Sequence, residues 1–175
     1  MKRMLEIPNA FGDRYSNVEF VHGPQAISEY THYNHALTGE RYVLTGNCAG
    51  FLDPVFSSGV AFATESGLCA AKLLDRQLRG EAIDWKREYE DHIRFGAEVF
   101  RSYVDTWYNG DLQEVFFADD VQQSYKERIV SVLAGYVWDL SNPFVTKHTK
   151  AVRSLAETIR LSQAERKART GTGLH

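Results

Sequence analysis

The segment best suited to chemistry is the connection at residues 46–60, GNCAGFLDPVFSSGV. An apolar run at residues 42–44 precedes it, and a helical pattern rich in small residues follows it. A strand-to-helix connection of this kind leaves backbone N–H groups unpaired at the positive end of the helix. Gly50 and Gly59 also let a ligand approach the backbone closely, because they have no side chain. The segment therefore suits an anion or the polar edge of a large cofactor, although a serine-capped helix after a tight turn would show the same pattern.

Composition limits the classes of function that need to be considered. The chain has 175 residues and a net charge of -3, which gives no basic surface for nucleic acid and no polybasic membrane anchor. Cys48 and Cys69 lie in apolar contexts rather than in a disulfide framework or a metal-ligand spacing, which indicates a reducing cytoplasm. No apolar run approaches the roughly 18 residues of a membrane-spanning helix. We therefore expect a cytoplasmic protein that binds neither nucleic acid nor membrane.

The elements that must position this connection are a few short strands followed only by helices. Alternating and apolar patterns predict strands at residues 18–22, 27–33 and 41–46, with a turn at 37–40. Cap residues and apolar periodicity predict helices at residues 58–78, 84–108, 119–134 and 141–161. Gly80 would end the first helix, and Asp84 would cap the second.

Further details of the sequence refine these helices. Two acids are expected in the first turn of the third helix, and Asn142-Pro143 is expected to start the fourth. One apolar stripe is expected along the second helix, at Phe95, Val99, Tyr103 and Trp107. The charge run DWKREYEDH, residues 84–92, is typical of a solvated helix face.

The predicted fold is α+β and mostly α. Its few strands belong to the edge of a larger sheet, since short strands need a sheet to join and the chain contains little else to build one. The expected parts are residues 1–80, with the strands and the helix that follows the connection, the helical region 81–162, and a polar tail at 163–175 that frays. The chain is thus predicted to be the C-terminal portion of a larger protein.

Residues 46–67, GNCAGFLDPVFSSGVAFATESG, resemble the second FAD motif of flavin-dependent halogenases and related FAD monooxygenases. The resemblance continues more loosely downstream, where the family's C-terminal helices roof a substrate cavity. It implies FAD as cofactor, and an oxidoreductase that forms a flavin C4a-hydroperoxide to halogenate an aromatic or carrier-protein-bound substrate. It also implies a separate flavin reductase as partner. A homo-oligomer is expected for another reason, because the strands at 18–46 and the helix from Ser58 would leave apolar surface that self-association can cover.

The resemblance also implies which residues contact the cofactor, and they follow the motif position by position: Gly46, Asn47, Asp53, Pro54, Ser57, Ser58, Gly59 and Val60. In chlorinating members, backbone amides at the positions of Ser58 and Gly59 also hold the halide. Asn47 stands where the family usually has aspartate, and its amide brings no charge. No residue is assigned as catalytic.

The chain also departs from the family. Phe56 stands where tryptophan-specific members have glutamate, which disfavours indole chemistry, and the sequence has no GxGxxG turn for the adenosine half of FAD. None of Lys72, Lys86 or Lys126 can be equated with the family's catalytic lysine. We therefore expect this chain alone to bind FAD weakly or not at all. The alternatives are a flavin-dependent hydroxylase or geranylgeranyl-reductase-like protein, and an inactive fragment that acts as a binding module.

Other candidate sites have simpler structural explanations. His32 and His35 form an HYNH spacing that could hold a metal, but their surroundings indicate polar side chains at a strand edge. Ser57 and Ser58 lack the first glycine of a nucleophile elbow and are interpreted as helix caps. Six aromatic residues are predicted to lie in the core, with a subset as possible pocket lining: Phe95, Tyr103, Trp107, Tyr108, Phe116 and Phe117.

Overall fold

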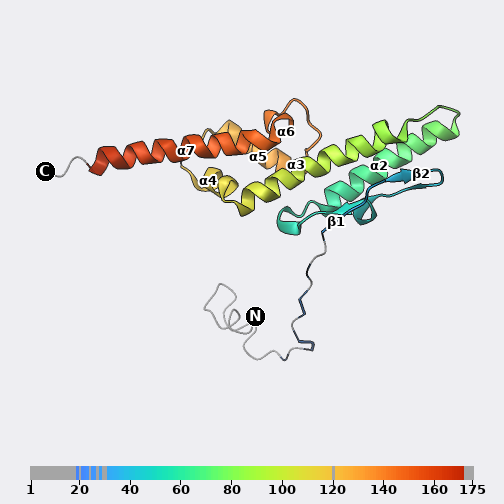
Figure 1. Ribbon diagram of the computed structural model, residues 1–175, viewed down its shortest axis with the longest axis horizontal. Coiled ribbons are helices and arrows are strands. Elements are labelled where there is room, and N and C mark those ends of the chain that lie inside the picture. The colour runs from blue at the N-terminus through green and yellow to red at the C-terminus, as the bar shows by residue number, and fades with distance from the viewer. Residues whose placement is uncertain are drawn as a thin grey trace. The chain divides into compact units, whose positions relative to one another are not determined.

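The computed structural model describes residues 31–119 and 121–171, together with residues 19, 21–23, 25, 26 and 28. The chain divides into two units, residues 1–30 and 31–175, and the second contains the elements described below (Figure 1). Residues 19, 21 and 22 of the strand predicted at 18–22 are described and are not in a strand, while residues 18 and 20 lie outside the described residues. Residues 27, 29 and 30 of the strand predicted at 27–33 also lie outside them.

The strands of the second unit form two short antiparallel pairs. β1 (His32–Tyr33) pairs with β4 (Gly50–Phe51), and β2 (Thr38–Gly39) pairs with β3 (Tyr42–Val43). The tight turn lies at residues 40–41 rather than at the predicted 37–40, because Thr38 and Gly39 are part of β2. The strand predicted at 41–46 is shorter than expected, since the chain turns into the 3-10 helix η1 (Gly46–Cys48). The fold is mostly α with few strands, as predicted.

The helix after the connection has the predicted bounds. α2 runs over Gly59–Leu78, and Gly80 follows its end with a φ of 92°, a backbone conformation that glycine adopts without strain. Four residues spaced three or four apart form its buried face: Phe62, Ser66, Ala70 and Leu73. α2 therefore presents one side to the rest of the unit and leaves another exposed.

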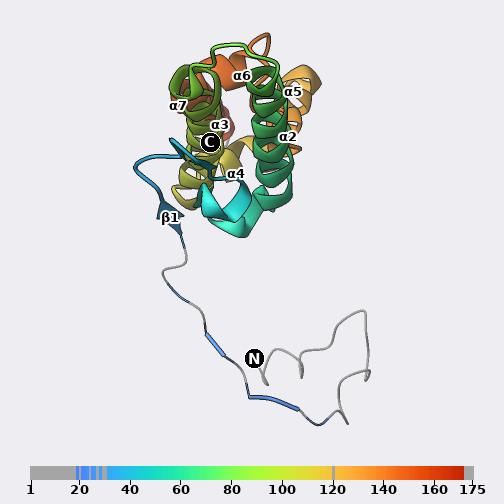
Figure 2. The same cartoon turned by 90° about the vertical axis from the view of Figure 1, so that its right-hand side faces the viewer.

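The second predicted helix begins with one π-helical turn. Oδ1 of Asp84 accepts a hydrogen bond from Arg87 N at 3.1 Å, which confirms the predicted cap. The π turn η3 (Lys86–Glu90) then leads into α3 (Asp91–Tyr108), which lies beside α2 in Figures 1 and 2. Val99 and Tyr103 are fully buried. Phe95 and Trp107 pack partly buried against the same core, so the predicted stripe is confirmed.

The helices after α3 differ from the prediction. α4 (Asp111–Phe117) was not predicted; it follows directly because Gly110 turns the chain with a φ of 91° and Asn109 Oδ1 accepts from Asp111 N at 2.9 Å. The predicted helix at 119–134 is α5 (Gln123–Leu133). Its start was placed too early, because the acids at 119 and 120 precede the helix rather than stabilising its first turn.

The last predicted helix is two helices. α6 (Pro143–Thr146) starts as predicted, with Asn142 Oδ1 accepting from Phe144 N at 3.0 Å. The backbone breaks at Lys147, and α7 (His148–Gly171) then continues through most of the segment predicted to fray. None of the helices described is long and apolar enough to cross a membrane.

Two clusters of buried side chains hold the unit together. One lies between α3, α4, α5 and α7 around Tyr103, and the other lies between α2, η3 and the strand region around Tyr89 and Ile93. Trp138 packs against both clusters. Its indole lies where a side chain on Gly96 would stand, so the close approach requires glycine there.

Candidate functional site

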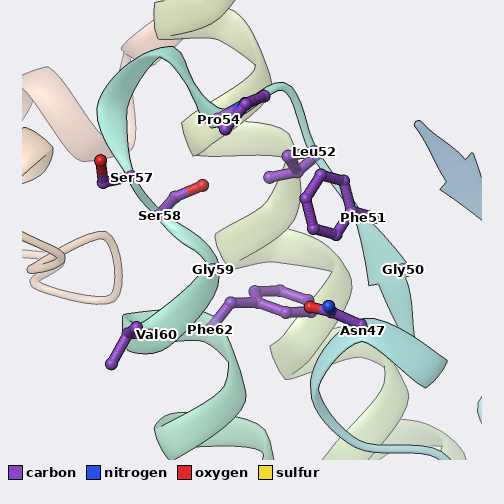
Figure 3. A pocket seen from close by; sticks show the side chains of 10 residues that line it. All are labelled: Asn47, Gly50, Phe51, Leu52, Pro54, Ser57, Ser58, Gly59, Val60 and Phe62. Carbon is purple, nitrogen blue, oxygen red and sulfur yellow. The ribbon is translucent and has the colours of Figure 1, made fainter. Parts of the chain in front are cut away.

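A pocket of about 240 Å³ lies at the N-terminal end of α2 (Figure 3). Its lining comes from the connection predicted to do chemistry: Asn47, Gly50, Phe51, Leu52, Pro54, Ser57, Ser58, Gly59, Val60 and Phe62. Six of the eight residues predicted to contact a cofactor are in this lining. Gly46 and Asp53 are not.

The chain reaches the pocket through a sharp turn. Pro54–Phe56 forms the 3-10 helix η2, and Asp53 Oδ1 caps it by accepting from Val55 N at 2.9 Å. Ser57 follows with a φ of 54°, which makes it the one non-glycine residue in the described part of the chain with a left-handed backbone. Such a conformation costs energy for a residue with a side chain, so the surrounding contacts must hold it. The turn brings the first residues of α2 to the pocket wall.

Ser58 does not act as the predicted cap. It occupies the N-cap position of α2, but its backbone is helical, with φ -68° and ψ -14°, and its side chain makes no capping hydrogen bond. The residue is only 6% exposed. Figure 3 shows its hydroxyl directed into the pocket, whereas the hydroxyl of Ser57 points away.

The remaining lining is apolar or neutral. The rings of Phe51 and Phe62 and the side chain of Leu52 form one side, and the amide of Asn47 reaches towards the same space (Figure 3). No charged side chain lines the pocket. A Cβ added to Gly59 would meet nothing within 4 Å, so the backbone there is open to a ligand. The N–H groups of the first turn of α2 have no acceptor within the helix.

Gly46 and Asp53 lie outside the pocket lining and make structural hydrogen bonds. Gly46 N donates to Ser66 Oγ at 2.9 Å, and its φ of 54° suits glycine. Asp53 Oδ2 accepts from Tyr108 Oη at 3.0 Å, which ties the connection to the end of α3. Because both carboxylate oxygens of Asp53 already have donors, its position indicates that it shapes the turn. Phe56 packs edge-on against Trp107, with ring centroids 5.7 Å apart.

The carboxylate of Glu90 is an anchor for the strand region that the sequence did not reveal. Glu90 Oε1 accepts from Leu37 N at 2.7 Å and from both Thr38 N and Thr38 Oγ1 at 2.8 Å. Burial opposes the ionisation of Glu90, but these hydrogen bonds and the neighbouring Arg94 hold its pKa below the usual value. Tyr89 Oη donates to Leu44 O at 2.6 Å from the same π turn.

Glu90 lies in the charge run interpreted above as a solvated face, and that interpretation is wrong at this position. The π turn changes the spacing of side chains, so that Tyr89 and Glu90 are both buried. Arg94 extends the anchor by donating to His35 O at 2.7 Å. The only signal of this anchor in the sequence was the spacing of Glu90 and Arg94, which are four residues apart. That spacing is equally typical of exposed ion pairs on a helix.

The other candidates from the sequence have structural roles. His32 Nε2 contacts Asn47 O at 2.8 Å, and within the described ranges no three metal-ligating side chains come together. Lys126 Nζ donates to Ala118 O at 2.9 Å, and Lys86 pairs with Asp91 at 3.3 Å. Of the six aromatic residues predicted for the core, Tyr103 is buried, while Tyr108 and Phe117 are exposed. None of the six lines the pocket at α2.

Comparison with known proteins agrees with the motif. The chain is 25% identical over 130 residues to a 1H-pyrrole-2-carbonyl-[peptidyl-carrier protein] brominase from Pseudoalteromonas luteoviolacea, covering 72% of this chain and 31% of the brominase. It is 27% identical over 113 residues to the corresponding chlorinase from Pseudomonas fluorescens, covering 63% of this chain and 25% of the chlorinase. The chain resembles part of a flavin-dependent halogenase. No family model matches it.

A solved structure extends the agreement to the fold. A flavoprotein/dehydrogenase from Cytophaga hutchinsonii is 42% identical and superimposes with a TM-score of 0.84, over 93% of this chain and 40% of that protein. The halogenase resemblance inferred from the motif is therefore confirmed, and these relatives support FAD as the cofactor. The chain spans less than a third of the length of the two pyrrole halogenases.

Proposed function

We propose that this chain is the flavin-contacting and C-terminal portion of an FAD-dependent, halogenase-like oxidoreductase. The observation that supports this most is the pocket at α2, because the motif that resembles the halogenases forms most of its wall. The polar groups of the pocket are backbone N–H groups, one hydroxyl and one amide. Such groups can hold the carbonyl edge of a flavin or a halide ion without any further charge.

The pocket fits part of the cofactor. Its volume of about 240 Å³ lies below the roughly 300–1,000 Å³ of pockets that enclose a whole ligand. The apolar side formed by Phe51, Leu52 and Phe62 suits the face of a planar ring, and the start of α2 suits that ring's polar edge. The adenosine half has no GxGxxG turn in this sequence. We therefore assign only the ring end of FAD to these residues.

In this proposal the flavin supplies the oxygen chemistry when it is bound. The chain positions it: Ser58, Gly59 and Val60 bind at the ring edge, Asn47 bonds from the opposite side, and the apolar rings exclude water. A halide at the amides of Ser58 and Gly59 would lie on the positive end of α2, beside the reacting part of the ring. The substrate class proposed is an aromatic ring, free or carrier-bound, with a separate reductase delivering reduced flavin.

Flavin titration of the chain tests the cofactor assignment. We expect weak binding, with FAD bound no more tightly than FMN, because only the ring end has a site. Flavin fluorescence quenching would measure both affinities. FAD bound much more tightly than FMN would show an adenosine site that the proposal lacks, and complete absence of flavin binding would favour the inactive-fragment alternative.

Product analysis of an intact protein that contains this chain tests the reaction. With reduced flavin, oxygen, bromide or chloride, and a phenol or a pyrrolyl carrier protein, we expect a product in which bromine or chlorine replaces a ring hydrogen, detected by mass spectrometry. Hydroxylated product formed equally with and without halide would replace the halogenase proposal with the hydroxylase alternative.

A further inference from the structure

A second and much smaller pocket, of about 30 Å³, adjoins the pocket at α2, and we call it the small pocket. The two pockets share Gly50, Leu52 and Phe62 in their linings, so these residues form a common wall (Figure 3). The opposite side of the small pocket is formed by α3, at Ile93 and Ala97. Protein interiors are closely packed and contain few such spaces, so its position beside the larger pocket suggests a purpose.

The lining of the small pocket is mostly apolar. Six of its ten lining residues are apolar side chains that are buried or partly buried: Leu37, Ala49, Leu52, Phe62, Ile93 and Ala97. A volume of about 30 Å³ has room for one water molecule or one diatomic gas molecule, and for nothing larger. The choice between these two occupants depends on the polar groups of the wall.

The polar side chains of the wall already interact with the chain. Arg94 Nη2 donates to Asn34 O at 3.0 Å, and Asn34 Nδ2 donates to Cys48 O. The guanidinium of Arg101 lies over the ring of Tyr33, 4.1 Å from its centroid. A bound water molecule needs two to four polar partners, whereas an apolar molecule needs none. The wall therefore favours a small apolar molecule over water.

We propose that the small pocket binds dioxygen and holds it beside the ring end of the flavin. The inference rests on the proposed function, in which the ring occupies the pocket at α2 and the flavin supplies the oxygen chemistry. Dioxygen is uncharged, apolar and small enough for the space. The common wall lies between the two sites, and Gly50 contributes no side chain to it.

Dioxygen itself is the first probe, because it is paramagnetic and accelerates the relaxation of nearby methyl protons. The methyl-labelled chain is measured under dioxygen pressure, without flavin. We expect faster relaxation at Leu37 and Ile93 than at Ile129 and Val152, which are similarly buried but belong to the other cluster. Equal relaxation at all four residues would overturn the inference. A nuclear Overhauser effect from bound water to the methyl groups of Leu37 or Ile93 would also overturn it, because the pocket would then be hydrated.

Filling the small pocket tests whether the relaxation arises there. Ala97→Leu adds a larger side chain to the lining and should abolish the additional relaxation at Ile93. Ala151→Leu is the matched control, since Ala151 is also a partly buried helical alanine but packs against the other cluster. Ala49→Val narrows the same pocket from the opposite side, in case Ala97→Leu does not fold. Additional relaxation that persists in a folded filling variant would contradict the proposal.

The role in the reaction is measured in an intact protein that contains this chain. We expect Ala97→Leu to slow the reoxidation of reduced flavin by dioxygen, to leave flavin affinity unchanged, and to recover at higher dioxygen concentration. Reoxidation as fast as in wild type would overturn the inference and leave the proposed function standing. Absence of flavin binding in the wild type would instead overturn the proposed function, and with it the role of the pocket, even where relaxation shows bound dioxygen.

Discussion

The start of β2 and the start of α2 treat their polar groups in opposite ways. At Leu37 and Thr38, which we call the paired segment, the carboxylate of Glu90 satisfies two backbone N–H groups and a hydroxyl. At Ser58 and Gly59, which we call the open segment, the serine side chain makes no capping hydrogen bond, and the first N–H groups of a 20-residue helix have no acceptor within the helix. Leu37 is 2% exposed, whereas Gly59 is exposed. The paired segment fixes the structure, and the open segment is accessible to a ligand.

The largest effect is expected where the paired segment loses its acceptor. Glu90→Ala leaves the buried N–H of Leu37 and the part-buried N–H of Thr38 without an acceptor and should cost about 3 kcal/mol of unfolding free energy. Urea unfolding would measure the loss, and Glu90→Gln, which can keep one acceptor oxygen, should lose clearly less. A loss below about 1 kcal/mol for Glu90→Ala would mean that the anchor is not structural.

The same carboxylate should make stability depend on pH. The pKa of Glu90 is lowered in the folded chain, so its ionised form stabilises the fold above its unfolded pKa. That contribution is lost as the pH falls through the lower folded value. We expect the acid limb of the stability curve to flatten in Glu90→Gln relative to wild type, as measured by urea unfolding at a series of pH values below about 5. An unchanged acid limb would contradict the assignment.

A smaller effect is expected at the tether between Tyr108 and Asp53, which joins the end of α3 to the connection before α2. Tyr108→Phe removes the hydrogen bond to Asp53, but Tyr108 is 66% exposed, so the loss of stability should be about 1 kcal/mol or less. Loosening of the turn should lower flavin or halide affinity more than stability. Tyr125→Phe, on an element away from the pocket, serves as control. Equal affinity in Tyr108→Phe and wild type would show that the tether does not position the pocket.

The smallest effect on stability, and one of opposite sign, is expected at Gly59. Alanine there meets no neighbouring atom and favours the helix, so Gly59→Ala should raise the unfolding free energy by up to about 1 kcal/mol. Gly96→Ala should instead destabilise the chain, because its methyl group would overlap Trp138. If the space beside Gly59 belongs to the ligand, the stabilised variant should bind halide or flavin more weakly. Unimpaired binding would place the ligand elsewhere.

The contrast between the paired and the open segment also bears on what could be predicted from the sequence. The bounds of α2, the caps at Asp84 and Asn142 and the stripe on α3 follow from local rules, and the structure confirms them. Six of the ten residues that line the pocket were predicted from the motif to contact the cofactor, and that contact stays a prediction. The role of Glu90 could not be predicted, because a π turn and a partner 52 or 53 residues away make it buried.

The predictions that were wrong also concern backbone geometry that local sequence rules do not determine. Ser58 has the residue type of a cap, but the left-handed turn at Ser57 before it sets a backbone that prevents capping. The break at Lys147 and the start of α5 are not marked by a glycine or a proline, so local rules gave no signal for either.

Backbone amide NMR during a bromide or FMN titration tests the central claim most directly. The account predicts concentration-dependent shifts of the N–H signals of Ser58, Gly59 and Val60, where donors lack acceptors. The signals of Leu37 and Thr38, already paired with Glu90, should stay in place. Saturable shifts at Leu37 and Thr38 with none at Gly59 and Val60 would contradict it, since the ligand would then bind where the chain has no free donors.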